Sequence, residues 1–430
     1  TRYDYEREHG FGHAVEMCNG AGVCRKKTGG TMCPSYMATL DERHSTRGRG
    51  NALRLAITGQ FDGSSPGPCW NDPETMATLN LCLSCKACKS ECPSNVDIAK
   101  LKAEYAAQSF DAAGGPTLKA TVFGAVRTLG RLGSFAAPLA NAINQTAIAK
   151  GLLRRVLGID PRRSVPAFCS SLSSQWKGEG IAADSTRARP KVALFGDCFT
   201  MFNEASIGLA AKRVLEACGY QVVLADAGCC GRAKISTGLL DQAIDEIDGT
   251  LSRLQPLIDD PDVVAIVVAE PSCLSAMKDD WLSLKVRSDR SLRERLASKA
   301  FLVEEFIESR WSQHPERPKF TTGPVPVLHA HCHQKALWGA ESSAAFLRRA
   351  CGGVRILDTG CCGMAGSFGY TTDRYDLSMK IGNLTLFPAL KASADAPVCA
   401  PGTSCRHQIH DGVGANALHP IQLVAQRLQH

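Results

Sequence analysis

The chain has 430 residues, 44% of them hydrophobic and 21% charged, a composition that indicates a globular protein of two or three domains. Its net charge of +7 is too small to indicate nucleic-acid binding, which normally requires a concentrated basic face. The sequence contains no apolar run of transmembrane length and no secretory signal. We therefore expect a cytoplasmic protein with no transmembrane helix and no nucleic-acid partner.

Cysteine is the unusual component, with 20 residues. A disulfide framework is typical of small secreted chains, whereas this chain is large. Several of its cysteines are adjacent or only two or three residues apart. Such neighbours are poorly placed to pair with each other and well placed to converge on one metal centre. The pattern therefore predicts metal ligation in a reducing compartment.

Residues 1–112 are predicted to form a helical ferredoxin-type domain that binds two 4Fe-4S clusters. Their most specific motif consists of Cys82, Cys85, Cys88 and Cys92 followed by Pro93. This is the C-x2-C-x2-C-x3-C-P run of bacterial ferredoxins, in which three thiolates bind one cluster and the fourth binds the other. Zinc needs four thiolates from two knuckles and has no use for the Cys-Pro end. The motif therefore favours iron–sulfur over zinc.

The partner group lies upstream and consists of Cys18, Cys24 and Cys33. Because the two groups exchange a ligand, one cluster is expected on Cys33, Cys82, Cys85 and Cys88, and the other on Cys18, Cys24 and Cys92. Ala21 stands where a ferredoxin has a cysteine, so the second cluster lacks its fourth ligand. The missing ligand would be supplied by Cys69, by a side-chain oxygen or by an imidazole such as His13, and a three-iron cluster would also fit. Cys69 is equally well explained as an unligated thiol.

Residues 113–188 are predicted to form a helical connector, with helices near residues 121–132 and 138–157, that ends in a polar linker. From Gly114 to Ile159 there is no acidic residue. The basic residues of this stretch are Lys119, Arg127, Arg131, Lys150, Arg154 and Arg155. A basic amphipathic surface for anionic lipid or for a partner is one interpretation. A helical linker packed on a neighbouring domain is the preferred one.

Residues 189–430 contain a duplicated unit, with copies at residues 189–300 and 301–430. The pairs Cys229/Cys230 and Cys361/Cys362, each within a GCCG sequence, lie 132 residues apart. A constant offset of this kind indicates an internal repeat. The first copy offers Cys198, Cys229, Cys230 and Cys273, and the second offers Cys332, Cys361, Cys362 and Cys405. We predict that both sets bind clusters.

Each copy alternates apolar strands, such as KVALFGDC and VVAIVVAE of the first copy, with helices, which include residues 234–254 of the first copy and residues 341–351 of the second. This alternation predicts an α/β fold whose parallel sheets are covered by helices, with ligands at the carboxyl ends of the strands. The cysteines follow those strands, and the GCCG glycines let the backbone approach a bulky cluster. His329, His331 and His333 of the second copy are candidate cluster ligands, hydrogen-bond donors or proton carriers, or else structural residues.

Other patterns are missing or unremarkable. No Gly-x-Gly-x-x-Gly sequence follows a predicted strand and no Walker loop occurs, so we expect no flavin, nicotinamide or nucleotide site on this chain. No Ser/His/Asp grouping is identifiable. Cys218 and Cys351 occupy equivalent helix ends and are predicted to be buried apolar residues.

From about Gly10 to the C-terminus, the chain resembles the iron–sulfur half of the fused FAD-linked oxidases, which are D-2-hydroxyacid dehydrogenases acting on D-lactate or D-2-hydroxyglutarate. It is also similar to the separate iron–sulfur subunit of glycolate oxidase. The matching stretches are CNGAGVCRKKTGGTMCPSYMATLDERHSTRGRGNALRL, LNLCLSCKACKSECPSNVD, RSVPAF and the two GCCG units. The GCCG units resemble the cysteine-rich CCG domain found in one of the subunits of heterodisulfide reductase. In the fused proteins a flavin domain precedes this module, which would explain a start without Met.

The resemblance implies an electron-transfer module with 4Fe-4S clusters. FAD would bind a dehydrogenase domain or partner outside this chain and take a hydride from a D-2-hydroxyacid. The clusters would pass the electrons to a quinone, a cytochrome or an electron-transfer flavoprotein. The resemblance also implies that membrane association is peripheral at most, on the inner face, and an oligomer is compatible with the sequence.

Two alternatives stay open. One is a heterodisulfide-reductase-like subunit whose catalytic cluster lies at the second CCG unit. That family ends each unit with Cys-x-x-Cys, whereas Glu270 and Gly402 replace the first cysteine of the pair here. The departure favours plain electron-carrying clusters, or only one occupied unit. The other alternative is a zinc-bound scaffold or regulatory protein.

Overall fold

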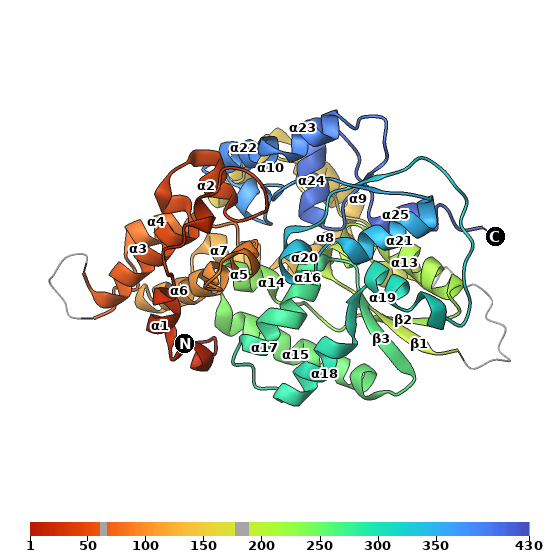
Figure 1. Ribbon diagram of the computed structural model, residues 1–430, viewed down its shortest axis with the longest axis horizontal. Helices are drawn as coiled ribbons and strands as arrows, with labels where there is room; N and C mark the ends of the chain where they lie inside the picture. The colour runs from red at the N-terminus through yellow and green to blue at the C-terminus, as the bar shows by residue number, and fades with distance from the viewer. Residues whose placement is uncertain (61–66, 177–188, 430) are drawn as a thin grey trace.

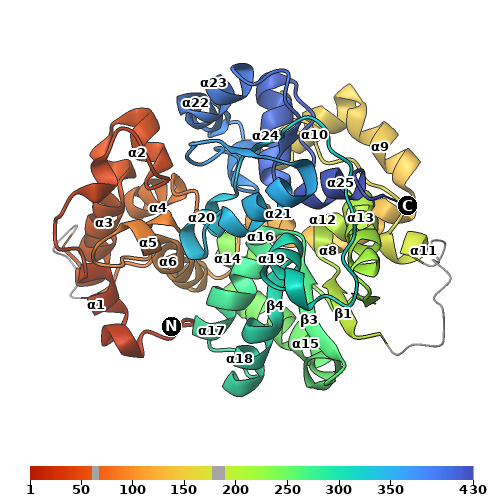
Figure 2. The ribbon, with the colours of Figure 1, turned by 45° about the vertical axis from the view of Figure 1, so that its right-hand side comes forward.

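The computed structural model describes residues 1–60, 67–176 and 189–429. Figure 1 shows a helical N-terminal region, coloured red to orange, beside two α/β units coloured green and blue. Figure 2 shows the same arrangement after a 45° turn, with the gold helices α9 and α10 at the outer rim of the α/β units. The predicted fold class is confirmed in both halves of the chain.

The N-terminal region is built from short helices. Its helices are α1 Phe11–Glu16, α2 Pro34–Thr39, α3 Thr46–Thr58, α4 Pro73–Asn80, α5 Ala87–Glu91 and α6 Ile98–Ala112, with 3-10 turns at Glu6–Glu8, Val23–Arg25 and Glu42–His44. The side chains of Ser45, Asp72 and Asp97 cap α3, α4 and α6 by accepting backbone N–H groups of the first turn. Leu53 and Leu79 are fully buried between these helices.

The connector is a run of helices: α7 Leu118–Gly124, α8 Val126–Phe135, α9 Ala137–Gln145, α10 Ala147–Leu157 and α11 Leu172–Trp176. The helix predicted at residues 138–157 is two helices, because Thr146 ends α9 and its hydroxyl caps α10 by accepting from Ala149 N at 3.2 Å. Across the described ranges, no helix combines the length and the apolar character needed to cross a membrane.

The first α/β unit holds a parallel sheet of four strands in the order β2-β1-β3-β4. The strands are β1 Lys191–Phe195, β2 Gln221–Ala225, β3 Val263–Val268 and β4 Ala300–Leu302. The helices are α12 Cys198–Phe202, α13 Ala205–Ala217, α14 Arg232–Ser236, α15 Leu240–Asp259, α16 Pro271–Ser275, α17 Trp281–Ser283, α18 Arg290–Lys299 and α19 Val303–Ser309, with a π-helical turn at Ala276–Asp280. Because β4 begins at Ala300, one strand spans the proposed unit boundary.

The second unit repeats this plan with shorter strands. Its parallel sheet has the order β6-β5-β7, which matches β2-β1-β3 of the first unit. The strands are β5 Val327–Leu328, β6 Arg355–Ile356 and β7 Val398–Cys399. The helices are α20 Cys332–Leu337, α21 Glu341–Cys351, α22 Tyr375–Leu384, α23 Leu386–Lys391, α24 Thr403–Val413 and α25 Pro420–Ala425, with 3-10 turns at Trp311–Gln313 and Phe368–Tyr370. The equal strand orders support the duplication inferred from the cysteine offsets.

One predicted helix is interrupted for a packing reason. The helix predicted over residues 234–254 is divided into α14 and α15 at Gly238, which has φ of +81°. A Cβ atom at Gly238 would lie 2.6 Å from the Cβ of Ala106 in α6. The break therefore lets the first unit approach the N-terminal region closely.

Candidate iron–sulfur sites

The N-terminal thiol group, defined as Cys33, Cys82, Cys85 and Cys88, surrounds one small cavity. Cys33 comes from the start of α2, while the other three come from the segment that leads into α5. Three of these cysteines are buried and Cys82 is half-buried. The structure thus brings together the four residues predicted to share a cluster.

The backbone around this group is held in uncommon conformations. Ser84 and Lys86 have φ of 51° and 60°, a region that costs free energy for residues other than glycine and is typical of functional sites. The backbone N–H of Ser84 points at Cys82 Sγ, 3.4 Å away. These turns direct the three thiols of the segment toward Cys33.

The surroundings of Cys33 combine burial with positive charge. Burial raises the pKa of the Cys33 thiol to about 11, and the nearby Arg49 guanidinium partly offsets this. Arg49 is itself buried and lies 3.9 Å from Cys33 Sγ, while Thr46 Oγ1 lies at 2.9 Å. Four thiols gathered in one largely buried site need a cationic centre to become thiolates together. An iron cluster supplies that centre, so the residues fit the group.

The second predicted N-terminal site is less compact. The guanidinium of Arg47 interacts with Cys24 and Cys18, so these two thiols share an environment. The turn that carries Cys92 is tied to the same loop, because Glu91 Oε1 accepts from Thr31 N at 2.7 Å. Joint ligation by Cys18, Cys24 and Cys92 stays a prediction.

The candidates for a fourth ligand lie elsewhere. Cys69 N donates to Ala56 O at 2.8 Å, near the C-terminal end of α3, whereas Arg47, which interacts with Cys18 and Cys24, lies at the start of α3. Nine residues of helix separate Arg47 from Ala56, about 13 Å. His13 is exposed, with its ring beside His9. Neither position supports the ligation predicted as an alternative.

The first-unit thiol group consists of Cys198, Cys229, Cys230 and Cys273, and all four residues are buried. They follow β1, β2 and β3, at the carboxyl edge of the sheet where the strand order reverses. Cys198 Sγ lies 3.4 Å from Cys229 Sγ, and Cys230 Sγ lies 3.0 Å from Cys273 Sγ. Hydrogen bonds from Cys198 and Cys230 lower the pKa of Cys229. The four thiols predicted for this unit therefore lie in contact.

The second-unit thiol group consists of Cys332, Cys361, Cys362 and Cys405, all buried. A hydrogen bond with Cys361 lowers the pKa of Cys332 to about 6 against the opposing effect of burial. Hydrogen bonds with Cys361 and Cys405 also lower the pKa of Cys362. Gly363, with φ of +92°, donates its N–H to Cys361 Sγ at 3.4 Å. The first unit has the matching contact, from Gly231 N to Cys229 Sγ at 3.5 Å.

One histidine distinguishes the second unit from the first. The nearest nitrogen of His329 and the sulfurs of Cys362 and Cys405 lie within 4.8 Å of one another. His329 Nδ1 is hydrogen-bonded to Thr359 Oγ1 at 2.7 Å, and its buried Nε2 has no hydrogen-bond partner among the described residues. The equivalent position in the first unit, at the end of β1, is the buried Phe195. Of the roles considered for His329, contact with a cluster is the one that its geometry fits.

The other two histidines of HAHCHQK have structural partners. His331 Nδ1 accepts from His333 N at 3.2 Å and caps α20. His333 Nδ1 is hydrogen-bonded to Ser275 Oγ at 2.8 Å, and its Nε2 to Ser84 O at 3.0 Å. His333 therefore joins both α/β units and the N-terminal region at one point.

The three thiol groups share one interior. Electrostatic interaction couples Cys85 of the N-terminal group with Cys332 of the second-unit group. Between the two units, Glu270 acts on both Cys273 and Cys405, and Glu270 Oε2 accepts from Thr403 N at 2.8 Å. Sequence reasoning missed these links because each joins residues far apart in the chain.

Cys218 and Cys351 lie outside the three groups, as predicted. Their side chains are 0% and 2% exposed and belong to the apolar core between the sheets and helices. Cys399 is also fully buried in that core. These thiols provide natural controls for any substitution of the proposed ligands.

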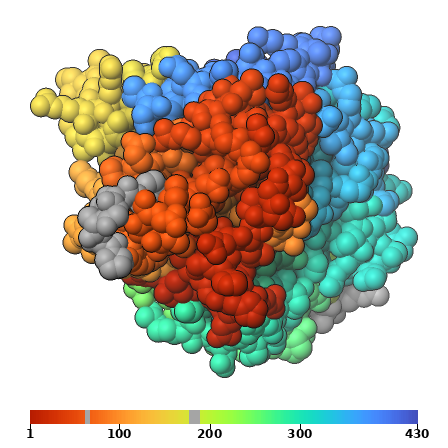
Figure 3. Space-filling view, turned by 60° about the vertical axis from the view of Figure 1, so that its left-hand side comes forward, coloured from red at the N-terminus to blue at the C-terminus, as the bar shows by residue number. Residues whose placement is uncertain are grey.

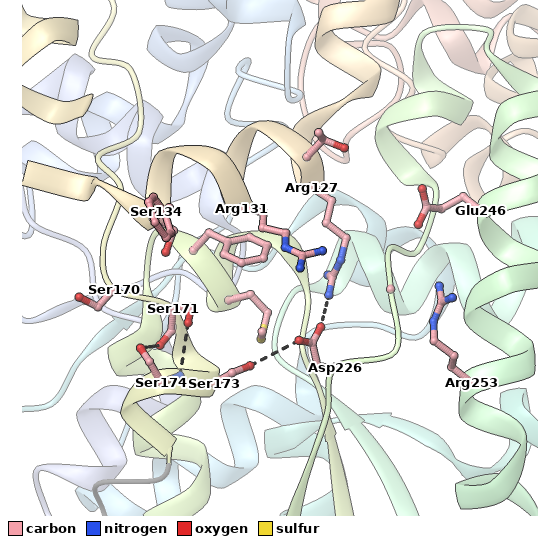
Figure 4. A pocket seen from close by; sticks show the side chains of 15 residues that line it. Arg127, Arg131, Ser134, Ser170, Ser171, Ser173, Ser174, Asp226, Glu246 and Arg253 are labelled. Atoms are coloured by element: carbon pink, nitrogen blue, oxygen red, sulfur yellow. Dashed lines mark hydrogen bonds and ion pairs between the residues drawn. The ribbon is translucent and has the colours of Figure 1, made fainter. Parts of the chain in front are cut away.

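A polar pocket of about 880 Å³ adjoins the first-unit thiol group (Figure 4). Its charged lining includes Arg127, Arg131, Asp226, Glu246 and Arg253, and Figure 4 also labels Ser134, Ser170, Ser171, Ser173 and Ser174. Arg127 pairs with Asp226 and donates to Gly196 O at 3.0 Å. Its guanidinium also interacts with the Cys198 thiol. From the sequence, Arg127 was identified only as one of the basic residues in a stretch without acidic residues.

Comparison with known proteins identifies two domains in this chain. A family model described as a 4Fe-4S dicluster domain matches residues 14–96, and one described as a cysteine-rich domain (CCG) matches residues 192–278. One of the subunits of anaerobic glycerol-3-phosphate dehydrogenase from Escherichia coli is 26% identical over 73% of this chain and 78% of the relative. The probable glycolate oxidase iron-sulfur subunit of Bacillus subtilis is 23% identical over 93% of this chain and 89% of the relative.

D-2-hydroxyglutarate dehydrogenase of Escherichia coli is 25% identical over 95% of this chain. The match covers only 43% of that relative, so this chain spans less than half of its length. The resemblance predicted from the cysteine motifs is confirmed. The chain therefore carries a 4Fe-4S dicluster domain and a CCG-type cysteine-rich domain, and it is similar to the iron–sulfur parts of FAD-linked oxidases.

Proposed function

We propose that this chain is the iron–sulfur electron-transfer module of an FAD-dependent D-2-hydroxyacid dehydrogenase. The flavin would be bound by a domain or subunit outside this chain and would oxidise the hydroxyacid. Bound clusters supply one-electron transfer. The chain would relay electrons to a quinone, a cytochrome or a flavoprotein acceptor, at the inner face of the membrane.

The observation that carries the proposal is the single buried interior shared by the thiol groups. The electrostatic interaction of Cys85 with Cys332, which share one buried core, and that of Glu270 with both Cys273 and Cys405 would keep neighbouring clusters close. The match over 95% of the chain to D-2-hydroxyglutarate dehydrogenase supports the choice of substrate class.

The proposed ligands follow the thiol groups. They are Cys33, Cys82, Cys85 and Cys88 for one cluster, Cys18, Cys24 and Cys92 for a second, Cys198, Cys229, Cys230 and Cys273 for the first unit, and Cys332, Cys361, Cys362 and Cys405 for the second unit. Across these sites the chain contributes burial, N–H groups directed at sulfur in three of them and a nearby guanidinium group in three of them. These features set reduction potentials.

A disulfide-reducing role is less well supported. Glu270, which replaces a ligand of that chemistry, is occupied as a hydrogen-bond acceptor for Ser272 N at 3.2 Å and Thr403 N at 2.8 Å. Its carboxylate therefore has a structural role between the two units. The proposed chemistry is electron relay without bond cleavage in this chain.

The test uses the anaerobically purified chain and its visible absorbance. D-2-hydroxyglutarate or D-lactate should leave the isolated chain oxidised, and addition of the FAD-containing partner should then bleach it. Hydroxyacid turnover by the flavin-free chain would refute the proposal. Bleaching that requires glycerol 3-phosphate and its dehydrogenase instead would retain the relay and overturn the substrate class. The Cys218→Ala variant, whose thiol lies outside the groups, should behave as the wild type.

A further inference from the structure

The connector helices α8, α9 and α10 expose large apolar side chains instead of burying them. Among the described residues, fifteen large hydrophobic side chains are strongly exposed, and nine of these lie between residues 118 and 156. Phe135 is 95% exposed and Ile148 is 86% exposed. The connector thus carries the main apolar surface of the described chain.

These side chains form stripes at helical spacing. In α8 the exposed residues are Leu129, Leu132 and Phe135, in α9 Leu139 and Ile143, and in α10 Ile148, Leu152 and Val156. Spacings of three and four residues place each set on one side of its helix. Each helix contacts the next along the chain. The stripes therefore lie on neighbouring helices, and we call these exposed sides together the outward surface; Figure 3 shows its yellow part, near residue 150, projecting at the edge of the molecule.

The inward side of α8 carries glycines where a surface helix normally has large apolar residues. A Cβ atom at Gly130 would lie 2.9 Å from Phe202, and one at Gly133 would lie 2.5 Å from Phe168. Glycine at these positions lets α8 lie close against Phe202 of the first unit and against Phe168 of the connector itself. As the linker interpretation expects, the connector packs on a neighbouring unit, but most of its large apolar side chains point away from that unit.

Charge follows the same surface. The six basic residues between Gly114 and Ile159 are accompanied by no acidic residue, so the remainder of the chain contributes only +1 of the net charge of +7. Arg131, Lys150, Arg154 and Arg155 are exposed. An apolar stripe flanked by cations suits a bilayer interface, where the apolar side chains enter the headgroup boundary and the cations meet anionic lipid.

We propose that the outward surface of α8, α9 and α10 binds anionic membranes in the plane of the lipid interface. A protein partner would need acidic groups opposite the cations and a surface shaped to receive the protruding side chains. An anionic bilayer supplies the negative charge in its headgroups and accepts apolar side chains without a complementary shape. The same helix α8 lines the polar pocket beside Cys198. A membrane-bound chain would therefore hold that pocket near the lipid surface.

The proposal deepens the peripheral location suggested above and does not depend on electron transfer, so its test uses the purified chain without substrate. Co-sedimentation is measured with vesicles of phosphatidylglycerol and phosphatidylcholine in equal parts, and with phosphatidylcholine alone. We expect binding to the anionic vesicles that falls as salt rises. The Arg154→Gln/Arg155→Gln variant should bind about 25-fold more weakly, since each cation near an anionic surface contributes about fivefold.

The apolar contribution is tested with Ile148→Glu/Leu152→Glu, at positions where exposed side chains leave the core intact. The matched control is Ile356→Glu/Leu384→Glu, whose side chains are exposed on the second unit. The first variant should lose vesicle binding, the control should keep it, and both should keep their circular dichroism spectra. Wild-type chain that ignores anionic vesicles would overturn the proposal. A second contradicting result would come from the Ile148→Glu/Leu152→Glu variant, if it still bound anionic vesicles but bound the flavin-containing partner more weakly than the control variant does.

Discussion

Lys86 provides a sharp test of how the N-terminal region is fixed to the first unit. Its side chain is 1% exposed, and its ammonium group lies 2.7 Å from Asp279 and 2.6 Å from Asp280. Replacement by Met leaves two buried carboxylates with fewer partners, and breaking such a buried pair costs about 3–5 kcal/mol. Arg232 stays 3.3 Å from Asp280. We therefore expect the low end, about 3 kcal/mol, from Lys86→Met.

The matched control is Lys89, which also pairs with Asp279 but is 39% exposed. Exposed pairs contribute roughly 0.2–1 kcal/mol, so Lys89→Met should cost at most about 1 kcal/mol. The assay is equilibrium urea unfolding of the cluster-free chain, followed by circular dichroism. Equal losses for the two variants would refute the reasoning, because they would show that burial of Lys86 adds nothing to its pairing.

Three further predictions concern the sites and the unit interface. Cys88→Ala should lower iron per chain by up to one cluster, measured by colorimetric iron assay, whereas Cys218→Ala should leave it unchanged; equal iron in both would contradict ligation at Cys88. His329→Phe, which copies the first unit, should alter one EPR signal of the reduced chain and leave the others, and an unchanged spectrum would remove His329 from the site. Burial opposes ionisation of Glu204, but Arg406 lowers its pKa to about 2. Its stabilisation, about 3 kcal/mol, is present above pH 4.5 and lost as the pH falls toward 2, so urea unfolding of Glu204→Gln should depend less on pH than that of the wild type.

The sequence was sufficient where chemistry is local. Cysteine spacing predicted the grouping of Cys33 with Cys82, and constant offsets predicted two α/β units with equal strand order. Helix Glu341–Cys351 has the predicted bounds. These features depend on short-range patterns, namely thiol spacing, strand alternation and repeated turns, which the sequence displays directly.

Contacts between distant segments could not be predicted. The sequence named Glu270 only as a missing cysteine, whereas its carboxylate bridges the two units. Three equivalent-looking histidines follow β5, and only the packing around Thr359 and Ser275 separates His329 from His333. The connector is the clearest case of a feature that the sequence does not predict, because helical periodicity does not tell which side of α8 packs on the first unit. That choice depends on the fit of Gly130 against Phe202.

The central claim is that the buried thiol groups hold iron–sulfur clusters that carry electrons. Its most direct test is the iron and acid-labile sulfide content of the anaerobically purified chain, with EPR of the dithionite-reduced sample. The account predicts iron and sulfide in equal amounts, sufficient for more than one 4Fe-4S cluster per chain, and signals typical of reduced clusters. A colourless, iron-free chain loaded with zinc would contradict it.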